Sequence, residues 1–182
     1  TPVTVIQMLW INMVMDTLAA LAFSFEAPLK EYMCELPKKR DEPIINQYMK
    51  DEILFTGIYS TLICILFLKL PIFHQLFRNG EQYILTAFFG LFIFISIFNS
   101  FNARTHRLNL LSNLKTNKTF IVIIAFIFVV QVLLIYFGGE LFRTSGLTFL
   151  EFQIMFLLSF TVVPVDFLRK LYLRKKGIIG GV

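Results

Sequence analysis

The protein has 182 residues, of which 57% are hydrophobic and only 16% are charged, with a formal net charge of +5. A soluble globular domain has a much more even balance of apolar and charged residues, so this composition excludes an ordinary soluble fold. The net positive charge does not indicate nucleic-acid binding, because the basic residues lie next to apolar blocks, where they suit anionic lipid headgroups.

Five apolar blocks follow one another along the chain, each close to the roughly 20 residues that a helix needs to cross a bilayer. Inside hydrocarbon every backbone N–H and C=O must be satisfied within the segment, which favours helices over isolated strands. The sequence therefore predicts an all-α fold, a polytopic transmembrane bundle of about five spanning helices. In chain order the predicted spans are residues 3–25, 53–73, 83–101, 120–138 and 147–168.

The first block begins almost at Thr1, without a basic leader or a signal-peptide cleavage site, so we expect a fragment of a longer polypeptide. The block also contains Asn12 and Asp16. A carboxylate near the bilayer centre costs about 2.5–3.5 kcal/mol on insertion scales and needs a compensating partner. In a helix, residues four apart share one face, so the two side chains offer up to three oxygens to a cation.

Two oxygen-bearing side chains cannot complete a calcium site, which takes about six to eight oxygen ligands. We therefore expect other helices to supply the rest. Two alternatives stay open from spacing alone: Asn12 and Asp16 can hydrogen-bond neighbouring helices as packing residues, or Asp16 can relay protons.

The connections between the blocks differ in charge. Fourteen of the 17 Lys and Arg residues lie in residues 27–52, in residues 102–118 or after Leu168, whereas Lys69, Arg78 and Arg143 lie near the other two connections. Basic residues favour the cytoplasmic side, so the first helix is expected to enter from outside and the C-terminus to be cytoplasmic. The basic residues after Leu168 are interpreted as a headgroup anchor. The connection 27–52 is either an ordinary solvated loop or a candidate contact for cytoplasmic domains.

Three motifs resemble those of one protein family. The segment from Gln7 to Ala22, with its Met-Asp-Thr triplet at residues 15–17, resembles the sixth transmembrane helix of P-type calcium ATPases of the plasma-membrane type. Residues 98–104, Phe-Asn-Ser-Phe-Asn-Ala-Arg, resemble the end of its eighth helix, and residues 131–139 are similar to its ninth. The resemblance covers the whole chain as helices six to ten and implies the plasma membrane or a bacterial inner membrane.

Carried over by position, Asn12 and Asp16 match calcium ligands of that family. Met15 and Ser96 stand where two-site pumps have oxygen ligands, so the resemblance implies one Ca²⁺ per cycle. It also implies Mg²⁺, ATP and an Asp-Lys-Thr-Gly phosphorylation motif in cytoplasmic domains; this sequence lacks the motif and is not expected to hydrolyse ATP alone. The implied partners are the lipid bilayer and the remaining helices and domains of the same polypeptide. The alternatives are a pump for another divalent cation, such as manganese, and a non-enzymatic membrane assembly or channel subunit.

Overall fold

The computed structural model describes residues 2–26, 43, 45, 47–105, 108–110, 114 and 117–176. Every regular element within these ranges is a helix, which confirms the predicted all-α fold. Most of the connection 27–52, the proposed contact for cytoplasmic domains, lies outside the described residues. The helices are α1 (Val5–Leu9), η1 (Trp10–Asp16), α2 (Thr17–Ser24), α3 (Gln47–Lys69), α4 (Pro71–Leu76), α5 (Glu81–Ala103), α6 (Lys118–Phe137), α7 (Gly139–Phe142), α8 (Phe149–Phe160) and α9 (Val162–Lys175).

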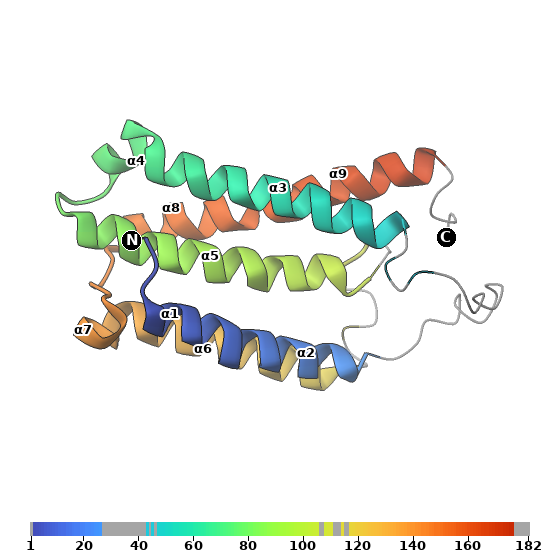
Figure 1. Ribbon diagram of the computed structural model, residues 1–182, viewed down its shortest axis with the longest axis horizontal. Coiled ribbons are helices and arrows are strands. Elements are labelled where there is room, and N and C mark those ends of the chain that lie inside the picture. The colour runs from blue at the N-terminus through green and yellow to red at the C-terminus, as the bar shows by residue number, and fades with distance from the viewer. Residues whose placement is uncertain are drawn as a thin grey trace.

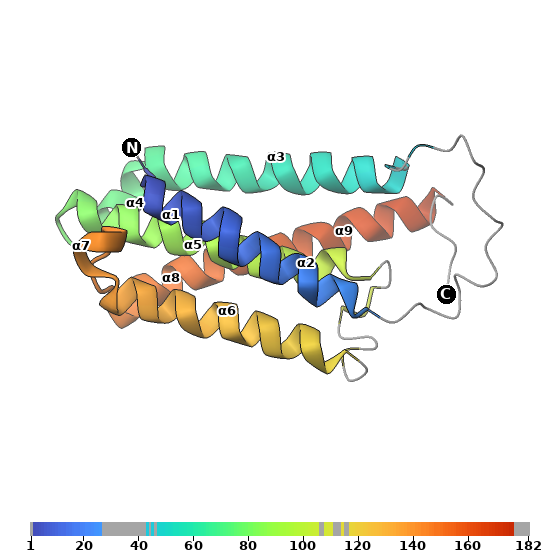
Figure 2. The ribbon, with the colours of Figure 1, turned by 60° about the horizontal axis from the view of Figure 1, so that its bottom comes forward.

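Five helical rods, among the residues described, are long and apolar enough to cross a membrane. The first rod joins α1, η1 and α2 without a break, and the fifth joins α8 and α9, while α3, α5 and α6 form the other three. All five run roughly along one axis, as Figure 1 and Figure 2 show. The number of spanning helices predicted from hydrophobicity is therefore confirmed.

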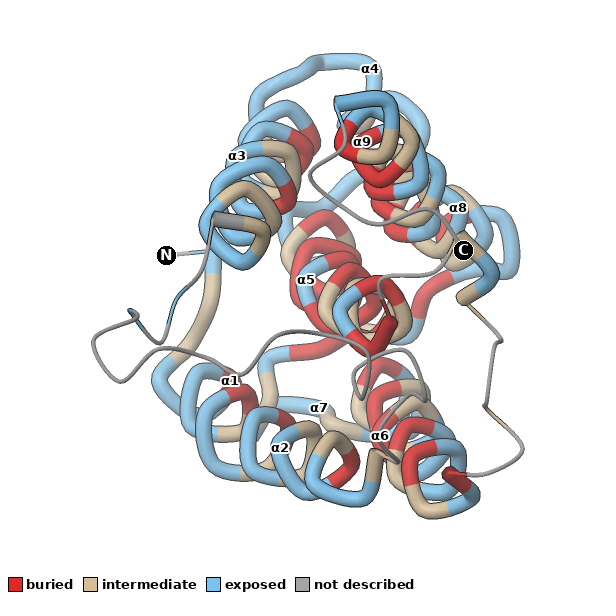
Figure 3. Tube along the Cα trace, turned by 90° about the vertical axis from the view of Figure 1, so that its right-hand side faces the viewer, coloured by how far each residue is buried: buried red, intermediate tan, exposed pale blue. Residues whose placement is uncertain are grey.

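Helix α5 forms the centre of the bundle. It packs against α3, α6, α8 and α9, and its buried residues cover most of its circumference (Figure 3). At Gly90 a side chain would collide with Met155 of α8 and press on Ile135 of α6. The absence of a side chain there allows these three helices to approach closely.

Proline and glycine divide the longer apolar blocks. Pro71 follows the end of α3 and starts α4, because its ring is compatible with a first helical turn but not with the interior of a helix. Pro164 cannot donate to the carbonyl of Phe160, and the fifth rod is interrupted at Thr161. Gly139 has a φ of 53°, a left-handed conformation that suits glycine and lets α7 turn away from α6.

The two ends of the bundle differ in charge. One end, which we call the basic end, holds the last residues of α2, α5 and α9 and the first residues of α3 and α6, at the right of Figure 1. At the opposite end, the described Lys and Arg residues are Lys69, Arg78 and Arg143. The structure thus gathers at one end the helix ends that flank the basic connections of the sequence.

Candidate site in the first membrane span

Asn12 and Asp16 both lie in η1, where the first rod changes from α-helix to π-helix. The π-helical stretch covers seven residues, Trp10 to Asp16, between α1 and α2. A π-helix uses i→i+5 hydrogen bonds, is rare, and occurs frequently at functional sites. Sequence reasoning missed this change, because the residues flanking Asn12 are ordinary helix formers without a proline or glycine.

The N-terminal end of the first rod is held by a capping box. Thr4 and Gln7 exchange backbone-to-side-chain hydrogen bonds of 2.8 and 3.2 Å, which satisfy two N–H groups at the start of α1. The Gln7 amide then donates to the carbonyl oxygen of Phe142 in α7, at 2.7 Å. These contacts fix the start of the first rod to α7, at the end of the bundle that lies opposite the basic end.

Asn12 and Asp16 share one side of η1, and that side is exposed. Ile11 and Met15, each 8% exposed, face the bundle interior, whereas Asn12, Met13 and Asp16 are exposed. The predicted proximity of the two candidate ligands on one helix face is compatible with this pattern. The five helices of this chain do not cover the face on which both candidate ligands lie.

The described residues provide no hydrogen bond or ion pair to the side chain of Asn12 or Asp16. The two buried carboxylates of the fifth rod differ in this respect. Glu151 pairs with Arg78 at 3.0 Å, and Asp166 pairs with Arg169 at 2.7 Å and with Lys170 at 3.0 Å. Asp16 is therefore a carboxylate deep within a span that has no partner among the described residues.

Met15 and Ser96, which stand where the resemblance places oxygen ligands of two-site pumps, are not part of this exposed face. Met15 is part of the buried hydrophobic core. Ser96 of α5 is half-buried, and its hydroxyl donates to the carbonyl oxygen of Phe92 one turn earlier, at 3.0 Å. No three His, Cys, Asp or Glu side chains come together as a metal cluster in the described part of the chain. Among the described residues, Asn12 and Asp16 remain the candidate ligands, and they would form at most part of a cation site.

The basic end of the first rod is tied to α5 and α6 by a buried cation. The guanidinium of Arg104, at the end of α5, donates to Glu26 at 2.8 Å, just after α2. Asn117 donates to the other oxygen of Glu26, at 2.8 Å, and accepts from the N–H of Phe120 to cap α6. The exit of the rod that carries the candidate site is thus fixed to two neighbouring helices.

A second buried network joins α3, α5 and α9 at the basic end. Lys170 is completely buried; it donates to the carbonyl oxygens of Asn102 and Thr105, at 2.7 and 2.8 Å, and pairs with Asp166. Arg169 donates to Asp166 and to the hydroxyl of Tyr48, at 2.7 and 3.2 Å. A cation is favourable at the end of a helix, where carbonyl groups lack partners.

This network corrects one interpretation from the sequence. Arg169 and Lys170 were expected to anchor lipid headgroups with the rest of the C-terminal basic run, but they are 5% and 0% exposed and bind protein groups. The spacing carried a usable signal, because Asp166 lies three and four residues before the two cations, where side chains on a helix meet. Lys175 and Lys176, in contrast, are exposed.

The opposite end of the bundle is closed by another ion pair. Arg78 donates to Glu151 through its backbone N–H and its guanidinium, and to the carbonyl oxygen of Gly146, at 2.6–3.3 Å. The hydrogen bond to Glu151 raises the pKa of the Arg78 guanidinium above its ordinary value. The connection before α5 is thereby held to the start of α8.

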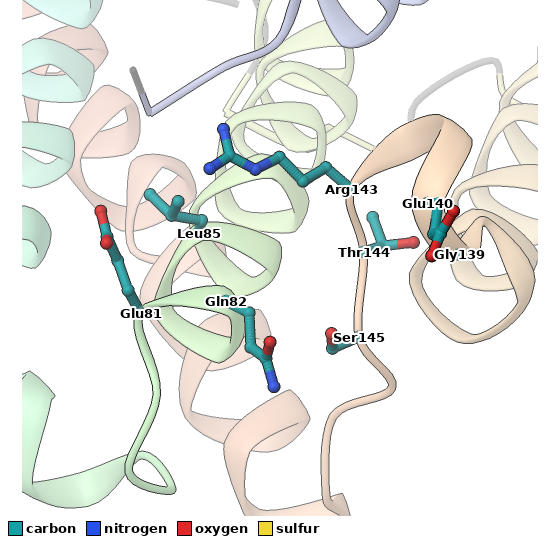
Figure 4. A pocket seen from close by; sticks show the side chains of 8 residues that line it. All are labelled: Glu81, Gln82, Leu85, Gly139, Glu140, Arg143, Thr144 and Ser145. Carbon is teal, nitrogen blue, oxygen red and sulfur yellow. The ribbon is translucent and has the colours of Figure 1, made fainter.

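A hollow of about 500 Å³ opens at this same end, between α5 and the turn around α7. Glu81 and Gln82 line one side and Arg143 and Ser145 the other, while Glu140 lies beside Gly139 on the far side of the turn (Figure 4). Neither Asn12 nor Asp16 belongs to its lining. The hollow is therefore separate from the candidate cation site.

Five apolar spans, one of which carries an amide and a carboxylate, define a multi-pass integral membrane protein. A family model described as "Cation transporting ATPase, C-terminus" matches residues 1–172. The protein belongs to this family, as the resemblance of its sequence motifs implied.

Three relatives illustrate the match. The chain is 31% identical over 174 residues to "Plasma membrane calcium-transporting ATPase mca-1" of Caenorhabditis elegans, covering 90% of this chain and 14% of the relative. It is 32% identical over 190 residues to "Calcium-transporting ATPase PAT1" of Dictyostelium discoideum, covering 96% and 17%. It is 33% identical over 160 residues to "Plasma membrane calcium-transporting ATPase 1" of Gallus gallus, covering 81% and 13%. The chain thus spans less than one fifth of the length of these relatives.

Proposed function

We propose that the chain is the C-terminal membrane part of an ATP-driven calcium pump, in which Asn12 and Asp16 bind the transported ion. The observation that carries the proposal is the exposed side of η1, where both side chains lie in an apolar rod without partners among the described residues. Lipid is a poor environment for a carboxylate, so this side requires a polar partner such as a cation and other helices of the complete polypeptide. Relatives named as calcium-transporting ATPases favour Ca²⁺ as that cation.

The chemistry of the side chains agrees with a hard cation. Asn12 and Asp16 present oxygen atoms, the ligands that calcium prefers, whereas the nearby Met15 is buried in the core and carries no side-chain oxygen. Met15 has no side-chain oxygen, and the hydroxyl of Ser96 is bonded within its own helix, so neither adds an oxygen ligand at this face. We therefore expect a single calcium site, completed by helices that precede this chain. ATP and Mg²⁺ act in the cytoplasmic domains of the complete protein, where the phosphoryl group is transferred.

The charge difference between the ends gives the proposed orientation. The basic end would face the cytoplasm, because basic residues near short connections are retained on that side. The C-terminus would then be cytoplasmic and the hollow around α7 would face the outside. A plasma-membrane location is proposed from the names of the relatives.

The test measures calcium-dependent phosphoenzyme formation by the complete protein, with Asp16→Asn compared with wild type and with Glu81→Gln. Glu81 is an exposed carboxylate at the opposite end of the bundle from the basic end, outside the proposed site. Asp16→Asn should abolish the response to calcium, and Glu81→Gln should retain it. An unchanged calcium dependence of Asp16→Asn would refute Asp16 as a ligand.

The same preparation tests the ion and its number. One occluded calcium per phosphoenzyme is expected, and a ratio near two would overturn the single-site proposal. If manganese but not calcium supports phosphorylation, the protein is a pump for a different divalent cation. If neither supports phosphorylation of the complete wild-type protein, the pump proposal is wrong.

A further inference from the structure

One polar side chain lies on the inward face of α6, among apolar ones. The buried residues of this helix are Phe120, Ile124, Ile127, Gln131 and Ile135. Gln131 is 0% exposed, and neither Nε2 nor Oε1 of its amide has a hydrogen-bond partner in the structure. A buried amide that lacks partners costs free energy, so a conformation that supplies them is favoured over one that does not.

The inward face of α6 packs against two neighbours. At one end, the ring of Phe120 lies 5.8 Å from that of Phe23 in α2 and 5.3 Å from that of Phe101 in α5. Towards the other end, Ile135 contacts the surface of α5 at Gly90. Gln131, one turn before Ile135 on the same face, therefore lies on the side of α6 that faces the first rod and α5.

Helix α5 cannot satisfy the amide of Gln131 with its side chains. Phe128 of α6 packs on Phe94 of α5, with ring centroids 5.2 Å apart, and Ile135 packs at Gly90. Gln131 lies between these two contacts, and the α5 residues between them are Leu91, Phe92 and Ile93, which carry no polar side-chain atom. Helix α8 also reaches α6, where Phe156 and Phe152 pack on Phe128 and Tyr136, but these α8 side chains are apolar. The first rod is the other neighbour that can offer a polar partner.

The antiparallel register places Gln131 at the level of η1. Asn117, before α6, donates to the carbonyl oxygen of Ala22 in α2, and Phe142, after α6, accepts from Gln7 in α1. The middle of α6 thus lies at the level of the middle of the first rod. The two pack closely at α2 and draw apart towards α1 (Figure 2). The residues of the rod at this level are those of η1.

A complementary group lies at the start of η1. The indole Nε1 of Trp10 is buried and has no hydrogen-bond partner in the structure, although the ring packs against the core. An indole N–H can only donate, and the Oε1 atom of Gln131 can accept. Two neighbouring helices therefore each hold a buried polar group without a partner, at the same depth and with matching chemistry.

We propose that Gln131 is a positioning residue for η1, and that its amide bonds to Trp10 and to the η1 backbone in the ion-occupied conformation. This inference rests on the proposed function, because η1 carries the proposed ligands Asn12 and Asp16. Conversion of η1 between i→i+5 and i→i+4 hydrogen bonding rotates its residues relative to α2 and changes which carbonyl groups are free. Hydrogen bonds made in only one of the two conformations shift the equilibrium towards it, and ion binding is then tighter.

The test replaces the amide with an apolar side chain of similar shape. Gln131→Met in the complete protein should raise the calcium concentration for half-maximal phosphoenzyme formation about three- to tenfold, as expected for one or two neutral hydrogen bonds made in one state only. Maximal phosphoenzyme should be unchanged, and the calcium-free protein should unfold at the same or a higher temperature. The matched control is Gln153→Met on the exposed side of α8, which should leave the calcium dependence unchanged.

A second variant tests the proposed partner. Trp10→Phe removes the N–H donor and keeps an aromatic ring, so it should also raise the calcium concentration for half-maximal phosphoenzyme formation. The double variant should need no more calcium than the more strongly affected single variant. Wild-type calcium dependence in Gln131→Met, while Asp16→Asn has lost its response, would overturn this proposal and leave the proposed function standing. Additive effects of the two substitutions would overturn the pairing with Trp10. Absence of a calcium response in the wild-type protein would overturn both proposals.

Discussion

The buried ammonium of Lys170 should contribute strongly to the stability of the bundle. Its nitrogen lies 2.7 and 2.8 Å from the carbonyl oxygens of Asn102 and Thr105 and 3.0 Å from Asp166. In Lys170→Met the aliphatic part of the side chain is kept, but two carbonyl groups and one side of a buried carboxylate lose their partner. Breaking a buried ion pair from one side costs about 3–5 kcal/mol. Arg169 continues to pair with Asp166, so the lower part of that range is expected.

Unfolding of the protein in mild detergent, followed with temperature or denaturant, measures this loss. Lys175→Met is the matched control, because Lys175 is an exposed residue of the same helix, and it should change stability by less than about 0.5 kcal/mol. The double variant Asp166→Asn with Lys170→Met should be less stable than Lys170→Met, since the buried Arg169 then loses its carboxylate partner. Equal stability of Lys170→Met and Lys175→Met would show that the buried pair contributes nothing, and would refute the reasoning.

Two further substitutions test how the rods are held together. Arg104→Met should cost about 1.5–3 kcal/mol in the same unfolding assay, because Glu26 loses a charged hydrogen bond, whereas Lys118→Met, at an exposed neighbouring position, should be nearly neutral. Equal loss in both would contradict the proposed tie. Gly90→Val should cost about 1–3 kcal/mol of stability by overpacking α5 against a methionine of α8. Gly57→Val should not have this cost, because no atom lies within 4 Å of the added carbon. Similar losses of stability in the two variants would mean that α5 and α8 separate easily.

The number and type of the spans could be predicted because they depend on one strong local property. A run of apolar residues long enough to cross hydrocarbon has to be helical, and this holds whatever the neighbouring helices are. The ends of the spans were less predictable. Helix α3 starts at Gln47, six residues before the apolar block at Ile53, because the polar residues in between continue the helix and contact α9.

The candidate site was predictable in composition but not in backbone geometry. Asp16 stands out in the sequence because it is a carboxylate deep in an apolar block, and this holds without any structure. The π-helical hydrogen bonding of η1 and the direction in which Asp16 faces depend on how the first rod is held by α6 at α2 and by α7 at α1, which the local sequence does not encode. Gln131 is visible in the sequence as an amide in an apolar block, but the side it faces was not, because α6 is otherwise apolar nearly all round and periodicity cannot distinguish its inward face.

Exposure has a different meaning in this bundle from its meaning in a soluble protein. Large apolar side chains such as Val122, Phe137 and Leu157 are 66%, 81% and 64% exposed, which is ordinary for surfaces that face lipid tails. Exposed apolar residues therefore do not show which sides of the bundle receive further helices. Polar residues within a span do, since lipid cannot satisfy them and each must face protein, water or an ion. By this criterion the exposed side of η1 is the side from which the rest of the proposed pump would complete the cation site.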